Sequence, residues 1–482
     1  MARIVWLGAM PVMALLPFLA RAAECSACHA RQTKSLAESG MGRSFRLAES
    51  PPAPDAAFRH TASKSRAAVQ GARHLINGQG HQVRYAVGSG HTGTSFLIDR
   101  GGWLFQSPLS FYAARPDHWG VSPGYERDRV LDFSRPISEE CIFCHAGSAN
   151  FVKGSLNRFV NPPATGPLPC ERCHGDGDAH GQAPAASNIV NPARLSAAAQ
   201  RDAICEQCHL AGEARIWNPG KSWRDFVPGT TSLEDVLTVY VRSSPAGHLP
   251  VVSHAEQLAA SRCLQASAGK LWCGSCHRVH GGEDHRAACL NCHRGLTAAR
   301  HPAEQRDCVE CHMPKRAASD GGHTAVTDHR INRKPVRPSP AAQPPTPPLS
   351  LQPWRRPSQA LDARNLGLAY LAAAGRWDSP ALAQQGFALL APRQSEFSQD
   401  PEVLGALGYV LMRKNRPAEA TTLLAAAVAL APRDVRLRLN LALTLAASGR
   451  TEAARRALTE LLELDPQVDA ARAALALLDR PR

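Results

Sequence analysis

The chain begins with its longest apolar run. Residues Ile4–Ala20 are almost wholly apolar, Arg3 precedes them, and the small residues Ala22 and Ala23 follow. This arrangement is typical of a secretory signal peptide, which we assign to residues 1–23 with cleavage after Ala22 or Ala23. Elsewhere the sequence has no run approaching 18 consecutive apolar residues. We therefore expect no membrane span after cleavage, and a periplasmic or otherwise exported protein.

A pattern with a period of two residues occupies part of the segment from Arg73 to Ala113. Three short runs here have strand-like sequences: His81–Val87, Thr94–Ile98 and Trp103–Gln106. In the first, apolar and polar residues alternate, and the other two are rich in β-branched and aromatic residues. Glycine-rich turn sequences separate the three runs. Alternation bounded by turn residues is the pattern of half-buried strands. We predict a small antiparallel hairpin or meander here, in a chain that is otherwise mainly α-helical.

From residue 360 onward the apolar residues, mostly Ala and Leu, follow a helical period. Two stretches align at a spacing of 34 residues, so that Gly408, Ala420, Leu424, Ala427 and Pro432 correspond to Ala442, Ala454, Leu458, Leu461 and Pro466. The pattern resembles tetratricopeptide repeats, in which small residues let paired helices approach and a proline ends each unit. A looser unit covers Leu361–Pro392, and we expect Asp469–Leu478 to be a capping helix.

A helical solenoid of this kind has a concave face that binds other proteins. We therefore expect the repeats to dock a redox partner. A helical cap over the rest of the chain and a dimerisation unit are the alternatives. A proline-rich stretch at residues 332–359, with nine prolines from Pro335 to Pro357, precedes the repeats and is predicted to be an extended, semi-rigid linker.

The cysteines carry the strongest chemical signal. Fourteen of the 15 belong to seven copies of the pattern Cys-x-x-Cys-His, numbered here from the first to the seventh motif in chain order: Cys25–Cys28–His29, Cys141–Cys144–His145, Cys170–Cys173–His174, Cys205–Cys208–His209, Cys273–Cys276–His277, Cys289–Cys292–His293 and Cys308–Cys311–His312. Two thiols at this spacing can each add across one vinyl group of a haem, and the following histidine can bind the iron. We predict seven covalent haems c.

Zinc binding and a disulfide framework are the alternatives for such cysteines, but a disulfide framework would leave cysteines without an attached histidine. Only Cys263 lies outside the motifs. It is either a small buried apolar residue or a reactive or iron-binding sulfur. Met313, directly after the seventh motif, is interpreted as a packing residue rather than an axial ligand.

Composition agrees with a cofactor-rich chain. Aromatic residues make up only 6% of it, so we expect the haems to form much of the core of residues 24–331 and the haem-free form to be largely unfolded there. The formal net charge of +14 would suit a nucleic-acid-binding protein. The propionates of seven haems would add about fourteen negative charges, which explains the excess without nucleic acid.

Each haem iron needs a sixth ligand or an open face. Thirteen histidines lie outside the motifs. Those whose local context favours a distal ligand are His60, His180, His254, His280, His323 and His329, with His301 or His285 next. Few histidines closely follow the first and second motifs, so an open iron is first expected there.

The motifs and their surroundings, CHGDGDAH at the third, CHRVH at the fifth and CHMPK at the seventh, resemble the multihaem cytochromes c related to cytochrome c nitrite reductase, hydroxylamine oxidoreductase and the tetrahaem cytochrome of ammonia oxidisers. The resemblance covers about Cys25–Arg330. It implies closely packed haem pairs, largely bis-histidine ligation, and electron transfer as the basic activity. The chain has no Cys-x-x-Cys-Lys, so the lysine-ligated haem of typical nitrite reductases is missing.

We therefore divide the chain into a signal peptide (1–23), a loop-rich seven-haem cytochrome c domain (24–331), a proline-rich linker (332–359) and a TPR-like α-solenoid (360–482). The first functional hypothesis is electron transfer through seven haems and their iron atoms, with the repeats docking a partner. The alternative is an oxidoreductase in which one open haem reduces a small nitrogen or sulfur oxyanion. The sequence identifies no catalytic residue.

Overall fold

The computed structural model describes residues 25–49, 54–115, 117–147, 150–160, 163, 165–243, 249–295, 307–321, 323–334 and 346–480. The predicted signal peptide, His301 and residues 335–345 of the predicted linker lie outside these residues. Helix makes up 41% and strand 16% of the structure. The expectation of a mainly α-helical chain is therefore only partly right, because strands are more frequent than the sequence indicated.

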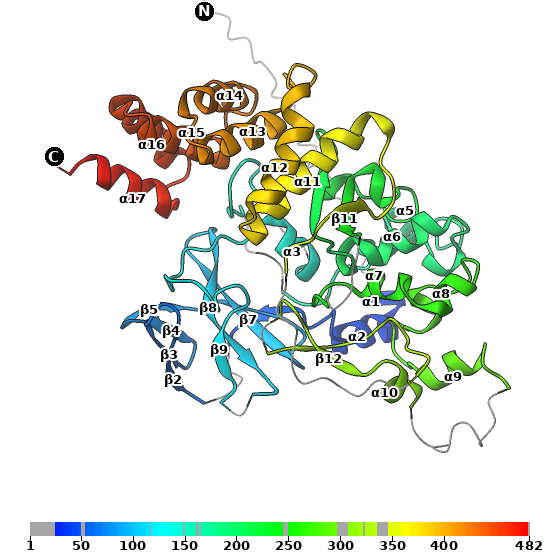
Figure 1. The fold of residues 1–482 in the computed structure, drawn as a ribbon. Coiled ribbons are helices and arrows are strands. Elements are labelled where there is room, and N and C mark those ends of the chain that lie inside the picture. Colours follow the sequence, from blue (N-terminus) through cyan, green and yellow to red (C-terminus); the bar gives the residue numbers. More distant parts are fainter. Residues whose placement is uncertain are drawn as a thin grey trace, which may run out of the picture.

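Two antiparallel sheets follow the first motif, where a small hairpin was expected (Figure 1). After the short helices α1 (Cys25–Cys28) and α2 (Ala30–Glu38), the chain forms β1 (Phe45–Leu47), β2 (Ala56–Arg59), β3 (Arg66–Gln70), β4 (Arg73–Ile76), β5 (Gln79–Gln82), β6 (Tyr85–Val87), β7 (Gly93–Asp99), β8 (Leu104–Tyr112) and β9 (Trp119–Val121). One sheet has the order β1-β6-β7-β8-β9 and the other β2-β3-β4-β5.

The five-stranded sheet is buried on both faces. Phe96 and Ile98 on one face pack with Val69 of β3 in a core shared with the smaller sheet. The opposite face carries Leu97 and Leu104, which pack with the helix of the second motif, α3 (Glu139–His145). The sheet thus fixes the position of the second motif.

Short helices and loops make up most of the region from residue 165 to 334. The helices are α4 (Glu171–His174), α5 (Asp178–Gln182), α6 (Ala198–His209), α7 (His254–Ala259), α8 (Arg262–Ala266), α9 (His285–Leu290) and α10 (Cys308–His312), with a 3-10 turn η4 at Cys273–Ser275. A two-stranded ribbon joins β12 (Lys315–Ala317) and β13 (Ala325–Thr327). Residues 203–240 contain a buried core that includes Trp223 and Leu237, whereas few residues are buried in the rest of this region, which leaves room for large cofactors.

The end of the predicted linker is a strand rather than a spacer. Leu351–Pro353 forms β14, which pairs with β11 (Leu237–Arg242) and extends the sheet that β11 makes with β10 (Ala214–Trp217). Directly after β14, Arg355 forms ion pairs with Glu206 and Glu234. This part of the proline-rich segment is therefore integrated into the region of the motifs.

The C-terminal helices pair as the repeat pattern predicts (Figure 1). They are α11 (Asp362–Trp377), α12 (Pro380–Leu390), α13 (Pro401–Arg413), α14 (Pro417–Leu430), α15 (Val435–Ala447), α16 (Thr451–Leu464) and α17 (Asp469–Leu478). The repeated small residues lie at the helix contacts, since Ala420, Ala442 and Ala454 are fully buried. Helix α17 has the bounds expected of the capping helix.

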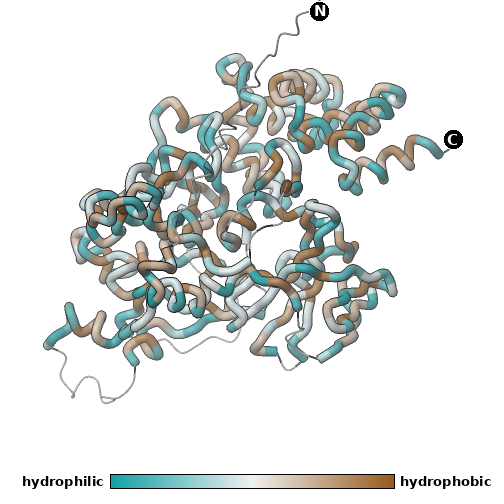
Figure 2. The backbone as a smooth tube through the Cα atoms, turned by 180° about the vertical axis from the view of Figure 1, so that it is seen from behind, coloured by the Kyte–Doolittle hydropathy of each residue, from teal (hydrophilic) through white to brown (hydrophobic). Residues whose placement is uncertain are grey.

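The solenoid packs on the rest of the chain along its length. Helix α11 lies against β10 and β14, and the buried Arg364 donates to the carbonyl oxygen of Trp217 at 2.8 Å. Further along, the Val435 amide donates to the Gly154 carbonyl at 2.8 Å. The molecule has several separate hydrophobic cores, and hydrophobic stretches of the chain occur in all its parts (Figure 2).

Candidate functional site

One large cavity collects the motifs. Its volume is about 3380 Å³, several times the roughly 300–1,000 Å³ of an ordinary small-molecule pocket. Both cysteines and the histidine of each of the first six motifs line it, and the seventh motif borders it through Val309 and Met313. Side chains that are spread over almost 300 residues of sequence therefore face a common space.

Each motif is folded as a single helical turn. The backbone amide of the histidine donates to the carbonyl of the first cysteine, four residues earlier, at 2.7 Å in the first motif, 2.9 Å in the third and fifth, and 3.0 Å in the sixth. Residues three and four apart lie on the same face of a helix. Two thiols and one imidazole are therefore presented together, which is the arrangement that covalent haem attachment requires.

Thiols of different motifs lie side by side. Cys25 lies near Cys170, Cys205 near Cys273, Cys289 near Cys308, and Cys144 near Cys208. Two further pairs lie close enough to interact electrostatically, Cys173 with Cys205 and Cys276 with Cys292. The motifs thus form a continuous series, first–third–fourth–fifth–sixth–seventh, and the second motif joins it at the fourth.

Two histidine pairs have the ring spacing expected of axial ligands. The rings of His180 and His29 are nearly parallel with centroids 6.2 Å apart, and those of His280 and His174 are nearly parallel at 6.1 Å. An imidazole nitrogen binds a metal at about 2 Å, so two imidazoles on opposite sides of one iron have ring centroids roughly 6 Å apart. The structure therefore places the distal candidates His180 and His280 opposite the first and third motifs.

Two more candidates, His254 and His329, lie beside the fourth and fifth motifs. The rings of His254 and His209 are 5.2 Å apart and nearly perpendicular, and those of His329 and His277 are 6.1 Å apart. The rings of His254 and His329 are themselves in contact, at 4.9 Å. The structure brings these four histidines into one cluster and leaves more than one pairing within it open.

Several of these histidines are oriented through one ring nitrogen. Backbone carbonyls face Nδ1 of four rings: Val190 at His174 (2.7 Å), Ala185 at His180 (3.1 Å), Asn332 at His312 (2.6 Å) and Thr327 at His329 (2.9 Å). A proton on Nδ1 leaves the lone pair of Nε2 free for a metal, which is the usual outer contact of a metal-binding histidine. The tautomer that leaves Nε2 free for a metal is therefore favoured at these four rings.

Burial keeps other ring nitrogens neutral. It lowers the pKa of His209 to about 4 and that of His254 to about 3, with smaller contributions from neighbouring histidines. Only a neutral imidazole can bind a metal. Burial also raises the pKa of the Cys263 thiol, which lines the cavity near Cys276 and Cys292, and this favours the unreactive thiol form.

Two distal candidates lie away from the cavity lining. His60 is buried beside the small sheet, where Nδ1 contacts Ser63 Oγ at 2.8 Å and Nε2 contacts the Glu126 carbonyl at 3.2 Å. His323 contacts Arg115 Nη1 at 2.6 Å through Nε2. Both ring nitrogens of His60 and Nε2 of His323 thus have polar partners within the protein.

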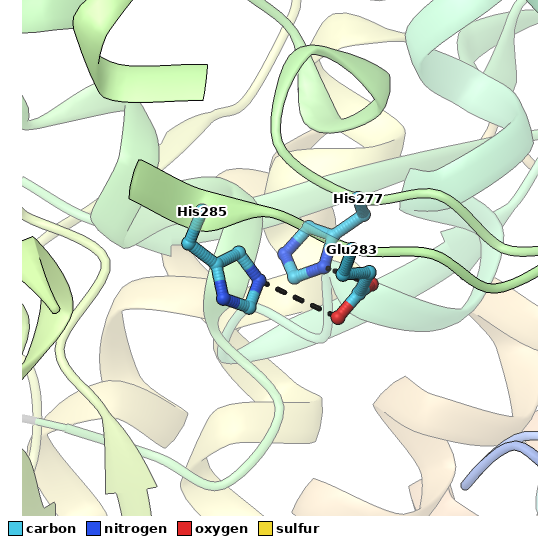
Figure 3. Close-up of side chains that lie close together, drawn as sticks. All are labelled: His277, Glu283 and His285. Carbon is cyan, nitrogen blue, oxygen red and sulfur yellow. Dashed lines mark hydrogen bonds and ion pairs between the residues drawn. The ribbon is translucent and has the colours of Figure 1, made fainter. Parts of the chain in front are cut away.

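His277 has a charged partner (Figure 3). Its Nδ1 lies 3.2 Å from one carboxylate oxygen of Glu283, and the other oxygen lies 3.4 Å from Nε2 of His285. The three side chains offer ligand atoms within 4.8 Å of one another. His285, which was a secondary distal candidate, therefore contacts Glu283 and lies beside His277.

Sequence reasoning missed the part of the site that the large sheet supplies. Ser95, Gln106, Ser110 and Tyr112 line the cavity from β7 and β8, on the face that packs against the second motif. Ser95 and Ser110 hydroxyls are 3.0 Å apart, and Arg135 donates to Gln106 Oε1 at 3.2 Å. The alternate polar positions of Gln106 and Ser110 in LFQSPLSFY are a signal for this face.

The residues fit covalently bound haem. Each motif supplies two thiols and an imidazole on one turn, and the cavity is large enough for several cofactors. Nδ1 of His145 and of His254 are buried without a hydrogen-bond partner among the described residues. Polar atoms left in this way usually mark a group or water that completes the site.

Comparison with known proteins identifies the C-terminal part. Residues 411–478 match the family model of the tetratricopeptide repeat, which confirms the prediction of such repeats there. No curated protein matches the chain. Among solved structures, the chain is similar to the outer cell wall cytochrome OcwA, with 15% identity, a TM-score of 0.43, and coverage of 94% of this chain and 98% of that one.

A second similar structure is an undecahaem cytochrome from the S-layer of Carboxydothermus ferrireducens. Its identity to this chain is 15% and the TM-score 0.28, with 83% of this chain and 63% of that chain covered. Among the described residues, the helices are all too short or too polar to cross a bilayer.

Proposed function

We propose that this chain is an exported multihaem cytochrome c that transfers electrons through seven covalently attached haems. The observation that supports this most is the series of neighbouring motifs whose thiols line one cavity or border it. Haems bound there would supply one-electron chemistry, and their close packing would suit transfer from one to the next.

The protein's own residues would hold the cofactors and set their environment. In each motif the two thiols would hold the porphyrin. The histidine that ends the motif would bind iron from one side. His180 and His280 would bind from the other side at the first and third motifs, and His254 and His329 would do so within the cluster of the fourth and fifth. Backbone carbonyls at Nδ1 would keep these rings in the iron-binding tautomer.

Mass spectrometry of the mature protein tests the proposal directly. We expect seven haem additions and an N-terminus after Ala22 or Ala23. Fewer additions would contradict the count of seven, and a protein that carries zinc in place of haem would overturn the proposal.

The solenoid is proposed to dock a redox partner, which would match the use of tetratricopeptide repeats in protein binding. Part of the solenoid surface is already covered by other parts of the chain, at Trp217, Gly154 and Leu156. A partner would therefore bind on the remaining surface, where Tyr409 and Leu430 are partly exposed.

A second candidate function is reduction of a small oxyanion at the second motif. Polar residues of β7 and β8 face this motif, and the histidines described in the two sheets all lie outside the cavity lining. Arg135 holds Gln106 Oε1, so the amide hydrogens of Gln106 are free to point into the cavity. An iron without a distal imidazole there would bind cyanide or nitrite and give a high-spin EPR signal. Seven low-spin irons that bind neither ligand would exclude this function.

A further inference from the structure

Glu283 connects two histidines next to the fifth motif. Its carboxylate oxygens lie 3.2 Å from Nδ1 of His277 and 3.4 Å from Nε2 of His285 (Figure 3). His277 directly follows Cys276, so its Nε2 is the atom assigned to the iron in the proposed function. The carboxylate therefore contacts the opposite nitrogen of a proposed axial ligand.

The local fold is built to bring Glu283 back to His277. Gly281 and Gly282 both have positive φ, at 84° and 76°, which turns the chain after His280. A side chain at Gly281 would also collide with Ser35, because its Cβ would lie 2.5 Å from Ser35 Oγ. The next residue after Glu283, Asp284, caps α9 by accepting from the Ala287 amide at 2.8 Å.

This cap fixes the direction in which α9 begins, and hence the position of His285 at its first residue. His285 then contacts the second oxygen of Glu283 and limits the rotation of the carboxylate. The contact between Glu283 and His277 is thus supported from both sides: by the glycine turn before it and by α9 after it.

The partner of His277 differs in kind from those of other motif histidines. His174 and His312 donate from Nδ1 to neutral backbone carbonyls, of Val190 and Asn332. A carboxylate is a stronger acceptor than a carbonyl, because hydrogen bonds to ionised groups are roughly twice as strong as neutral ones. It draws the Nδ1 proton toward itself and makes the ring a more basic ligand.

We propose that Glu283 is a positioning residue that lowers the reduction potential of the haem held by Cys273, Cys276 and His277. The inference rests on the proposed function, since it needs a haem at this motif. A more basic axial imidazole, together with the nearby negative charge, stabilises the oxidised iron more than the reduced iron. The fifth motif lies between the fourth and the sixth in the thiol series, so the effect places a low-potential site inside the chain of carriers.

The variant Glu283→Gln tests this in the haem-loaded full-length protein. Glutamine keeps an oxygen that accepts from His277 and removes the charge. We expect the midpoint of one haem to rise by an amount equal to about a tenfold change in the equilibrium constant, or 59 mV for one electron, while the other midpoints stay in place. Spectroelectrochemical titration measures the midpoints, and EPR follows the g-values of the same haem.

Glu310→Gln is the matched control. Glu310 lies inside the seventh motif, is exposed, and loses the same charge beside a haem without contacting a motif histidine among the described interactions. A rise in Glu283→Gln that Glu310→Gln does not reproduce supports the proposal. Unchanged midpoints, or an equal rise in both variants, would overturn it.

The same samples separate this inference from the proposed function. Mass spectrometry should find seven haems in the wild type and in both variants. If the wild type lacks haem at Cys273 and Cys276, the proposed function fails at this motif. If all seven haems are present and Glu283→Gln changes neither midpoint nor g-values, only the role of Glu283 is refuted.

Discussion

His180 and His60 illustrate how the surroundings of a histidine decide its use. Both follow a motif and both were predicted to be distal ligands. His180 faces His29 at 6.2 Å and is held at Nδ1 by Ala185 and Asn188. His60 has protein partners at both nitrogens. A ring with one engaged nitrogen can bind iron, whereas a ring with two cannot do so without losing a contact.

We predict different spectra for His180→Gln and His60→Gln. Loss of His180 should leave one iron five-coordinate, so EPR should show one new high-spin haem while the haem count remains seven. His60→Gln should keep every haem in its original spin state and lower stability by about 1–3 kcal/mol through its lost buried contacts. A high-spin signal in His60→Gln, or none in His180→Gln, would contradict this assignment.

His74 is a third case, a histidine that serves the core of the sheets. It is almost fully buried between Phe96 and Trp119, with Nδ1 2.7 Å from Ser107 Oγ. Burial lowers its pKa to about 3. The folded protein therefore holds the neutral ring at pH values where the unfolded chain, with an ordinary pKa near 6.5, binds a proton.

This difference predicts a pH dependence with a definite sign. The contribution of His74 to stability is complete above pH 6.5 and is lost as the pH falls from 6.5 toward 3, by about 1.4 kcal/mol per pH unit. Chemical denaturation of the wild type and of His74→Gln from pH 7 to pH 4 measures it. The stability difference between them should shrink with that slope on acidification, and a constant difference would argue against the buried neutral ring.

At the scale of elements, β14 changes the role of the segment before the repeats. Proline-rich sequence predicts an extended chain, and an edge strand is an extended chain whose backbone has found a partner. Leu351 is buried in the core that continues into the solenoid, and β14 pairs with Tyr240 to Arg242. The repeats are therefore held against the region of the motifs by a strand as well as by helix contacts.

Two leucines two residues apart test this attachment. Leu351→Ala should lower the free energy of unfolding by about 2–4 kcal/mol, because it leaves a cavity in a packed core. Leu349→Ala should change it by less than about 0.5 kcal/mol, since Leu349 is 90% exposed. Denaturation followed by circular dichroism compares the two. Equal effects would mean that β14 does not carry the packing.

At the scale of the whole molecule, the buried apolar side chains are unevenly distributed. The sheets, the solenoid and residues 203–239 have apolar cores, whereas residues 165–197 and 249–334 surround the cavity with few buried side chains. Haem should therefore be needed most where the third, fifth, sixth and seventh motifs lie. This narrows the expectation that the whole of residues 24–331 unfolds without haem.

We predict that chain produced without haem attachment loses structure unevenly. Residues 165–197 and 249–334, which have few buried side chains, should become sensitive to protease, because ligation that exists only in the folded state contributes its binding energy to folding. The sheets at residues 45–121 and the repeats at 362–478 should resist longer. Limited proteolysis with mass-spectrometric mapping tests this, and uniform protection or uniform loss would count against it.

The sequence alone determined the features that depend on residues close together in the chain, namely the seven motifs and the helical repeats. A thiol–thiol–imidazole turn needs five consecutive residues, so all seven motifs could be recognised before any fold was known. Helical repeats follow a local period, and the bounds of the capping helix at Asp469–Leu478 agree with it. The strands between Arg73 and Ala113 were recognised only in part, because their pairing in two sheets joins segments that have no common local pattern.

The tertiary structure decided which distant residues meet. His180 lies 151 positions from His29, and nothing near either one specifies the other. The same holds for Glu206 and Arg355, whose ion pair joins the end of the proline-rich segment to the fourth motif. Such pairings follow from the packing of whole elements around the cavity, and only that packing separates His180, which faces a motif, from His60, which is held within the sheets.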